Sequence, residues 1–169
     1  MADNKLENIC PACGEKMVKI YMPEQKVNLD VCLNGCGGIY FDNREFEKFD
    51  ETNEDITPLL EAYKGKTFKT VDETKQRVCP VCKTKMVKNF SSAKKEIEVD
   101  ECYGCGGRFL DYKELEKIRA EYPNENERAD AAVKLLYKEA GQELAKFKVK
   151  YERSQQKPSI ISRFLGLNK

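Results

Sequence analysis

Short apolar runs near the start of the chain predict a β-hairpin and a third strand. Residues 17–21 and 27–31 are two such runs, and a turn at Pro23 separates them. A further run at residues 39–41 is long enough for one short strand. We therefore expect two paired strands and a third strand within this part of the chain.

A short helix is expected directly after the third strand. Asp42 and Glu45 have the spacing of a capping box, which predicts a helix from about residue 43 to residue 51. Phe46 and Phe49 are three residues apart, so they can lie on one face of this helix. We expect that face to cover the hairpin.

The same pattern returns 69 or 70 residues later, so the chain contains an internal repeat. Residues 86–90 and 97–99 correspond to the hairpin, and residues 108–110 to the third strand. Asp111 then occupies the position of the helix cap, ahead of a helix that carries Leu115. Repetition at this fidelity indicates duplication of one structural unit.

A charged linker, residues 51–78, separates the two copies and should contain one short helix. Thr57 would cap this helix, Pro58 would take its first position and Gly65 would end it. The linker has no flexible run of Gly and Ser, so the copies can keep a preferred relative orientation. The sequence does not define that orientation.

A much longer helix, over about residues 125–155, is expected after Pro123. Asn124 and Glu127 can start it, and apolar residues then recur at steps of three and four. These apolar residues are Ala129, Val133, Leu136, Tyr137, Ala140, Leu144, Phe147 and Tyr151. At ~45 Å the helix is longer than one small module can cover. Its stripe would therefore contact both modules, a second copy of the chain as a homodimer, or another protein.

The last residues, 158–169, form a short apolar and basic tail after the helix-breaking Pro158. Its apolar residues fall at helical steps, and we predict that they dock into a groove of a protein partner. They are Ile160, Ile161, Phe164 and Leu165. Packing of the tail on the modules is the alternative. A role at a membrane surface is disfavoured, because the tail is short and carries few bases.

Eight cysteines explain how units this small can fold, because such short apolar runs rarely supply a sufficient core. Four cysteines flank each hairpin, and four thiolates can close a tetrahedral shell around one Zn²⁺ with no open position. The two sets are Cys10, Cys13, Cys32 and Cys36, and Cys79, Cys82, Cys102 and Cys105. We therefore expect two small zinc modules and two Zn²⁺ ions.

Disulfide bonds are the alternative use of these cysteines. The regular spacing within each pair suits chelation, and no signal peptide is evident, so we expect a zinc protein in the reducing cytoplasm. Redox exchange through the paired thiols is a minor alternative, because thiols bound to zinc are poor nucleophiles. No apolar run of the sequence is long enough to span a membrane.

The formal net charge of +1 is unevenly distributed along the chain. Residues 1–50 carry 9 acidic and 6 basic residues, whereas residues 123–169 carry 6 acidic and 10 basic residues. An acidic first module would repel phosphates, on which nucleic-acid affinity largely depends. We therefore prefer a protein-binding adaptor and keep a nucleic-acid binder as the alternative.

No catalytic residue is predicted. The chain has no His, and its two acidic pairs with capping spacing need no acid-base role. These pairs are Asp42 with Glu45 and Asp111 with Glu114. Four apolar residues after the second cysteine pairs could stack on nucleic acid, but we prefer that they close the core. They are Tyr40, Phe41, Phe109 and Leu110.

Each copy resembles the transcription factor IIB type zinc ribbons of small bacterial proteins. The resemblance rests on the CPxC pair, the hairpin, the acidic residue two positions before the third cysteine, and CGG followed by aromatic residues. It implies a zinc-ribbon fold, four cysteine ligands per zinc and no catalytic activity. Tyr40 and Phe109 stand where such ribbons usually have Trp, and each can form the aromatic lid of its module. Three residues separate Cys32 from Cys36 where two are expected, and Gly35 can absorb the added residue.

We therefore predict a small, metal-dependent α+β protein with two tandem zinc-ribbon modules. Each module has a β-hairpin, a short third strand and a capped helix, and a long C-terminal α-helix and a short tail follow. The divisions are 1–50 for the first module, 51–78 for the linker, 79–122 for the second module, 123–157 for the long helix and 158–169 for the tail. The predicted function is a non-enzymatic, zinc-binding adaptor for a macromolecular partner.

Overall fold

The computed structural model describes residues 8–155 of the 169-residue chain. Within these residues the chain divides into two units, one that ends at Arg128 and one that begins at Ala129. The predicted docking residues Ile160, Ile161, Phe164 and Leu165 lie outside the described residues, so their role stays a prediction. The described part is a small α+β structure, and the predicted fold class is confirmed.

The first unit contains six described strands, and both predicted hairpins and both third strands are present. Each hairpin is antiparallel, and its second strand also pairs with the third strand of the same repeat. The strands are β1 (Val18–Met22), β2 (Val27–Val31), β3 (Ile39–Phe41), β4 (Val87–Phe90), β5 (Glu98–Glu101) and β6 (Arg108–Leu110).

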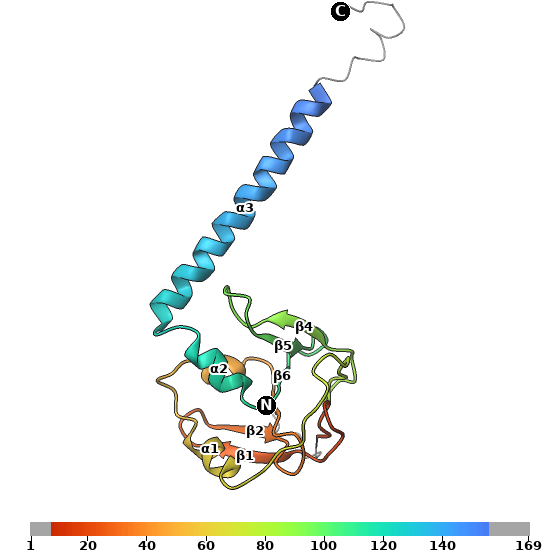
Figure 1. Ribbon diagram of the computed structural model, residues 1–169, viewed down its shortest axis with the longest axis vertical. Coiled ribbons are helices and arrows are strands. Elements are labelled where there is room, and N and C mark those ends of the chain that lie inside the picture. Colours follow the sequence, from red (N-terminus) through yellow and green to blue (C-terminus); the bar gives the residue numbers. More distant parts are fainter. Residues whose placement is uncertain (1–7, 156–169) are drawn as a thin grey trace, which may run out of the picture. The chain divides into compact units, whose positions relative to one another are not determined.

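The two repeats form one continuous sheet, because their third strands pair with each other. The strand order is β1-β2-β3-β6-β5-β4, and Figure 1 shows the two hairpins at its two ends. β3 and β6 are antiparallel, and Tyr40 faces Phe109 at the centre of their three-residue register. From either end, the order begins with the first strand of a hairpin, continues with the second and reaches the third strand at the centre. An approximate two-fold axis that relates the two repeats therefore passes between β3 and β6. The orientation that the sequence left undefined is set by this pairing.

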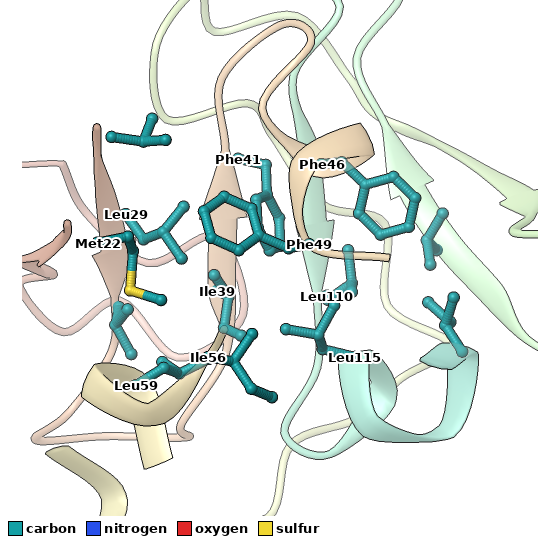
Figure 2. Close-up of a cluster of buried hydrophobic side chains, with 14 of the residues drawn as sticks. Met22, Leu29, Ile39, Phe41, Phe46, Phe49, Ile56, Leu59, Leu110 and Leu115 are labelled. Atoms are coloured by element: carbon teal, nitrogen blue, oxygen red, sulfur yellow. The ribbon is translucent and has the colours of Figure 1, made fainter. Parts of the chain in front are cut away.

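One face of the sheet carries a core to which both repeats contribute. Strand residues alternate between faces, so Ile39 and Phe41 lie on the same face as Leu29, whereas Tyr40 lies on the opposite face. Figure 2 shows this cluster, in which Leu110 and Leu115 of the second repeat join residues of the first. A pooled core of this kind overcomes the small size of each repeat, since burying one large apolar side chain contributes about 1.5–3 kcal/mol.

The helix expected over residues 43–51 is reduced to one 3₁₀ turn, η1 (Phe46–Lys48). Arg44 has φ +66°, a left-handed conformation that cannot continue a right-handed helix, so the helical turn begins after it. Only half of the predicted capping box forms: the Asp42 amide donates to the Glu45 carboxylate at 2.9 Å. The Glu45 amide donates instead to the backbone carbonyl of Asp42.

The second repeat begins its helix in the same way but completes it, as α2 (Glu114–Ala120). Lys113 has φ +70°, and the Asp111 amide donates to the Glu114 carboxylate at 2.7 Å. Leu115 and Ile118 are both buried in the shared core. The predicted helix is therefore present, but Asp111 does not cap it: Lys113 precedes its first residue, and the Glu114 amide donates to the Asp111 backbone carbonyl at 3.1 Å.

The linker helix is confirmed as α1 (Thr57–Tyr63), and it belongs to the core of the first unit. Thr57 is the first helical residue rather than the cap, and its amide donates to the carboxylate of Asp55 at 2.9 Å. Leu59 and Tyr63 are buried, and the Tyr63 hydroxyl donates to the carbonyl of Gly37 at 2.7 Å. The linker thus contributes packing as well as connection.

The long helix is confirmed as α3 (Glu125–Gln155). Asn124 caps it, because its side-chain oxygen accepts a hydrogen bond from the Glu127 amide at 3.0 Å. In the second unit, the apolar stripe is exposed to solvent: Leu136 is 66 % exposed and Leu144 is 69 % exposed. Among the described helices, none has an apolar stretch that could cross a lipid bilayer.

Candidate metal centres

The first cysteine cluster lies between the start of β1 and the turn after β2. Its four Sγ atoms are all within 4.8 Å of one another. Cys10 Sγ is 3.5 Å from Cys36 Sγ, and Cys13 Sγ is 3.4 Å from Cys32 Sγ. All eight cysteines of the chain are free thiols, so the disulfide alternative is wrong for this structure.

The second cluster has the same arrangement and is more accessible. Its Sγ atoms also lie within 4.8 Å of one another, with Cys79 and Cys105 3.6 Å apart and Cys82 and Cys102 3.2 Å apart. Cys82 is exposed, whereas the most accessible ligand of the first cluster, Cys13, is partly buried. The pKa of the Cys82 thiol is lowered to about 6, first by the hydroxyl of Thr84 and then by its amide.

Both clusters fit zinc. Tetrahedral Zn²⁺ with Zn–S bonds of about 2.3 Å needs sulfurs about 3.8 Å apart, close to the observed separations. A side chain at Gly35 would enter the first cluster, because its Cβ would be 2.6 Å from Cys13 Sγ and 2.8 Å from Cys32 Sγ. Four thiolates around a small cavity are a donor set that zinc prefers. The prediction of two Zn²⁺ ions is confirmed.

The added residue between Cys32 and Cys36 is accommodated without loss of the cluster. In the longer turn the Gly37 amide donates to the Cys32 carbonyl at 3.0 Å. In the shorter turn the equivalent Gly106 amide donates to the Cys102 carbonyl at 2.7 Å. Gly35 does not use a positive φ here, so its role is to leave space beside the sulfurs.

The aromatic residue after each CGG sequence covers the other repeat rather than its own. Tyr40 is 1 % exposed, and its hydroxyl lies 3.3 Å from Cys79 Sγ and 3.5 Å from Cys105 Sγ. Burial and then these two sulfurs raise the pKa of Tyr40, so the hydroxyl stays protonated and can donate to the thiolates. The expectation that Tyr40 is the lid of its own module is therefore wrong.

Phe109 makes the reciprocal contact with the first repeat. A Cβ at Gly38 would collide with the Phe109 ring, and a Cβ at Gly107 would collide with the Tyr40 ring. These two glycines therefore accept the aromatic residue of the other repeat at close range. Phe109 has no hydroxyl, so the first cluster receives no hydrogen bond equivalent to that from Tyr40. The aromatic residues are also too deeply buried to stack on nucleic acid, so that alternative is wrong.

A single row of side chains crosses the zinc-side face of all six strands. Successive cross-strand partners, from β1 to β4, run in mirror order around the central pair. They are Lys19, Asp30, Tyr40, Phe109, Asp100 and Lys88. The Lys and Asp at each end form ion pairs of 3.5 Å and 3.4 Å. The acidic residue two positions before the third cysteine therefore anchors the outer strand of its own hairpin.

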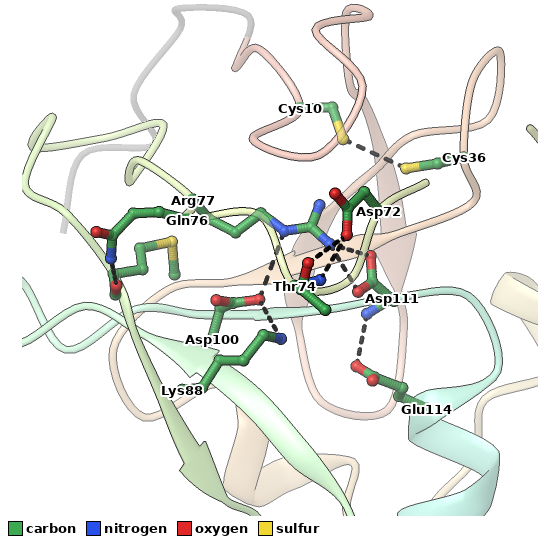
Figure 3. A network of polar contacts seen from close by, with 11 residues as sticks. Cys10, Cys36, Asp72, Thr74, Gln76, Arg77, Lys88, Asp100, Asp111 and Glu114 are labelled. Atoms are coloured by element: carbon green, nitrogen blue, oxygen red, sulfur yellow. Dashed lines mark hydrogen bonds and ion pairs between the residues drawn. The ribbon is translucent and has the colours of Figure 1, made fainter. Parts of the chain in front are cut away.

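Arg77 adds to the second repeat a contact that breaks the symmetry of this row, and Figure 3 shows its side chain between Asp100 and Asp111. It is 1 % exposed, and its Nη2 contacts the Asp111 carboxylate at 2.8 and 3.1 Å. Its Nε lies 3.6 Å from Asp100, and its guanidinium stacks 5.3 Å from the centre of the Phe109 ring. Asn8 stands at the equivalent place in the first repeat and donates to Asp30 at 3.0 Å.

Sequence reasoning missed the roles of Tyr40, Phe109 and Arg77. A signal existed for the aromatic pair, because each follows a second glycine, Gly38 or Gly107, that the turn of its own ribbon does not require for a positive φ. For Arg77 the signal was a basic residue two positions before Cys79, in a repeat whose Asp111 can accept an ion pair. The partners of all three lie far away in sequence, so spacing alone could not identify them.

Comparison with known proteins supports the assignment of the metal centres. A family model described as a transcription factor zinc-finger, the transcription factor IIB type zinc ribbon, matches residues 9–51 and again residues 78–121. Together the two segments make up about half of the chain. Neither the curated proteins nor the solved structures gave a match.

Replacing Tyr40 with Phe should weaken zinc binding at the second centre only. The variant loses the hydroxyl contact with Cys79 and Cys105, and loss of such a partner typically lowers metal affinity about 10- to 100-fold. Zinc transfer to a chromophoric chelator measures the change, and alkylation with mass spectrometry identifies the released cysteines. Tyr122→Phe is the control, since Tyr122 is also buried but contacts no sulfur. Equal retention of both ions in the Tyr40 variant would contradict the assignment.

Glu114→Gln should stabilise the protein more at pH 8 than at pH 6. Burial raises the pKa of Glu114 to about 7, against 4.5 when unfolded. Its folded-state pKa is raised, so the stability that it contributes is present at low pH and is lost as pH rises from about 4.5 to 7. Gln keeps the acceptor for the Asp111 amide without the charge. Glu45→Gln is the matched control from the first repeat, where the shift is smaller.

Chemical unfolding at both pH values with saturating zinc provides the measurement. The gain from Glu114→Gln should grow between pH 6 and pH 8 and exceed that from Glu45→Gln. A gain that is independent of pH would show that Glu114 is not protonated in the folded protein near neutral pH.

Proposed function

The chain belongs to the transcription factor IIB type zinc-ribbon family, and within that family we propose that it is a non-enzymatic adaptor for a protein partner. In this proposal the two zinc centres stabilise a joined pair of ribbons. The long helix α3 then offers the interaction surface.

The exposed apolar stripe of α3 is the observation that carries the proposal. Tyr137 is 78 % exposed, Phe147 is 68 % exposed and Val133 is 48 % exposed, all on one side of the helix. A helix in water normally buries such a stripe, and a long apolar surface on a folded protein usually marks an interaction site. The rest of α3 is dominated by charged and polar residues, as expected of a helix with one binding face.

The composition of the metal centres supports a structural role for zinc. Each centre has four sulfur donors, which leaves no open position for water or substrate. The acidic pairs are used locally: Glu45 and Glu114 each accept a backbone amide, and Asp111 binds Arg77. We therefore assign no catalytic residue.

The charge distribution favours a protein partner over nucleic acid. Residues 1–50 carry a net charge of −3, from 9 acidic and 6 basic residues. Four thiolates outweigh one Zn²⁺, so each metal centre adds further negative charge to the joined ribbons. Repulsion of phosphates by this unit opposes nucleic-acid binding. We also place the protein in the cytoplasm, because eight cysteines that form metal centres rather than disulfides suit a reducing compartment.

Capture from the native cell tests the adaptor role. The full chain and its Leu136→Asp and Leu144→Asp variants serve as baits, with Lys138→Asp on the opposite side of α3 as control. The proposal expects a reproducible protein partner that the wild type and the control capture and that the two Leu variants lose. Zinc content should be equal in all four proteins.

A titration with generic DNA and RNA at several salt concentrations completes this test. We expect no binding at physiological salt. Salt-dependent binding of micromolar affinity or tighter, with no loss in the Leu variants, would replace the adaptor with a nucleic-acid binder.

A further inference from the structure

Apart from Tyr137, the apolar stripe of α3 is symmetric about its own midpoint, Ala140. Leu136 and Leu144 lie four residues before and after Ala140, and Val133 and Phe147 lie seven residues before and after it. All four flanking side chains are between 48 % and 69 % exposed. A stripe with this symmetry meets itself in register when a second copy of the helix runs in the opposite direction.

We propose that α3 pairs with α3 of a second copy of the chain, antiparallel, with a two-fold axis at Ala140. Leu136 of each copy then packs on Leu144 of the other, and Val133 packs on Phe147. Such an interface is isologous, which is the commonest form of closed dimer. The inference rests on the proposed function, since it takes the stripe as an interaction surface and identifies the occupant as a second copy.

The period of the stripe suits two long helices without strong supercoiling. Val133 and Leu144 are eleven residues apart, and so are Leu136 and Phe147. An eleven-residue repeat corresponds to about 3.67 residues per turn, close to the 3.6 of a straight α-helix. The stripe therefore stays on one side of α3 along its length, and paired helices can remain in contact throughout.

Small residues lie where the two helices would cross. Ala140 is on the axis, and Gly141 is next to it. A Cβ at Gly141 would meet no heavy atom within 4 Å, so packing within the described chain does not require glycine there. Glycine inside a helix is less favourable than alanine. In the antiparallel pair, Tyr137 of the second copy would lie over Gly141, which gives this glycine a packing role.

The charges of α3 are complementary in the antiparallel direction. Residues 125–143 contain 5 acidic and 3 basic residues, and residues 144–155 contain 4 basic residues and 1 acidic residue. Antiparallel pairing therefore sets the acidic part of each helix against the basic part of the other. On the flank that carries Tyr137 and Gly141, Asp130 of one copy comes beside Lys148 of the other.

The opposite flank brings Glu139 of one copy toward Glu143 of the other. Lys146 lies 2.7 Å from Glu143 within the same helix, so a positive charge is already at this place. The attraction between Asp130 and Lys148 on the other flank therefore favours the antiparallel direction of the two helices. Exchange of these two charges can test that direction.

The mass of the full-length, zinc-loaded chain in solution tests the pairing. Sedimentation equilibrium at about 1–100 µM should give twice the chain mass of 19.5 kDa. Leu136→Asp should give the mass of one chain, while Lys138→Asp, on the opposite side of α3, should remain a dimer. Equal zinc content and equal thermal midpoints would show that the first unit is intact in each variant. A wild-type mass of one chain, or a dimer that survives Leu136→Asp, would overturn the proposal.

Exchange of two charges tests the direction of the pairing. Asp130→Lys or Lys148→Asp alone should weaken the dimer by roughly tenfold, because each creates two like-charge contacts. The double variant should restore the wild-type dissociation constant. In a parallel pair the two positions would be about 27 Å apart at 1.5 Å per residue, so the double variant would restore nothing. That result would overturn the antiparallel arrangement.

The two proposals fail in distinguishable ways. A wild-type chain that is monomeric, but loses its captured protein in Leu136→Asp, would leave the adaptor role standing and remove self-pairing. If Leu136→Asp abolishes the dimer but the variant still captures the same proteins, self-pairing of α3 is confirmed. The stripe is then not the surface that binds those proteins.

Discussion

Antiparallel pairing of β3 with β6 is the contact on which the rest of the first unit depends. It joins two ribbons, each too small to bury a sufficient core, into one six-stranded sheet with a shared apolar face. It also removes the two edges that isolated ribbons would expose to other strands. Because Tyr40 faces Phe109 in this register, the same pairing carries each aromatic ring into the other repeat. We therefore expect folding of the first repeat and metal binding at the second centre to be coupled through this contact.

Local pattern was sufficient to predict the elements and the ligands. Cysteine spacing identified both metal centres, apolar periodicity identified the hairpins and α3, and start and stop residues around Pro58 and Gly65 identified the linker helix. The helix after Asp42 was overestimated, because nothing in the sequence shows that Arg44 adopts a left-handed conformation. The joining of the ribbons could not be predicted, since pairing between Tyr40 and Phe109 is a contact across 69 residues. Spacing encodes neighbours in the chain, and this contact depends on the fit of two surfaces.

Duplication followed by divergence explains the unequal metal centres. The second centre is more exposed, yet it receives the Tyr40 hydroxyl, the Thr84 hydroxyl and, nearby, the buried Arg77. The first centre is covered by Phe109, which adds packing without a hydrogen bond. The two-fold symmetry of the backbone is therefore retained while the side chains specialise. The proposed adaptor role rests on a joined pair of ribbons followed by a long helix with one apolar side, and pairing of two α3 helices would bring two such pairs of ribbons into one assembly.

Zinc affinity at one centre after removal of the other tests the coupling most directly. Cys10→Ser with Cys13→Ser disables the first centre, and competition with a chromophoric chelator then measures the second. Loss of the first zinc should free β3 and withdraw Tyr40, so the affinity of the second centre should fall at least about 10-fold. Hydrogen exchange in β5 and β6 should quicken in parallel. A second centre that keeps its full affinity and its protection from exchange would show that the ribbons fold independently, and it would contradict the account.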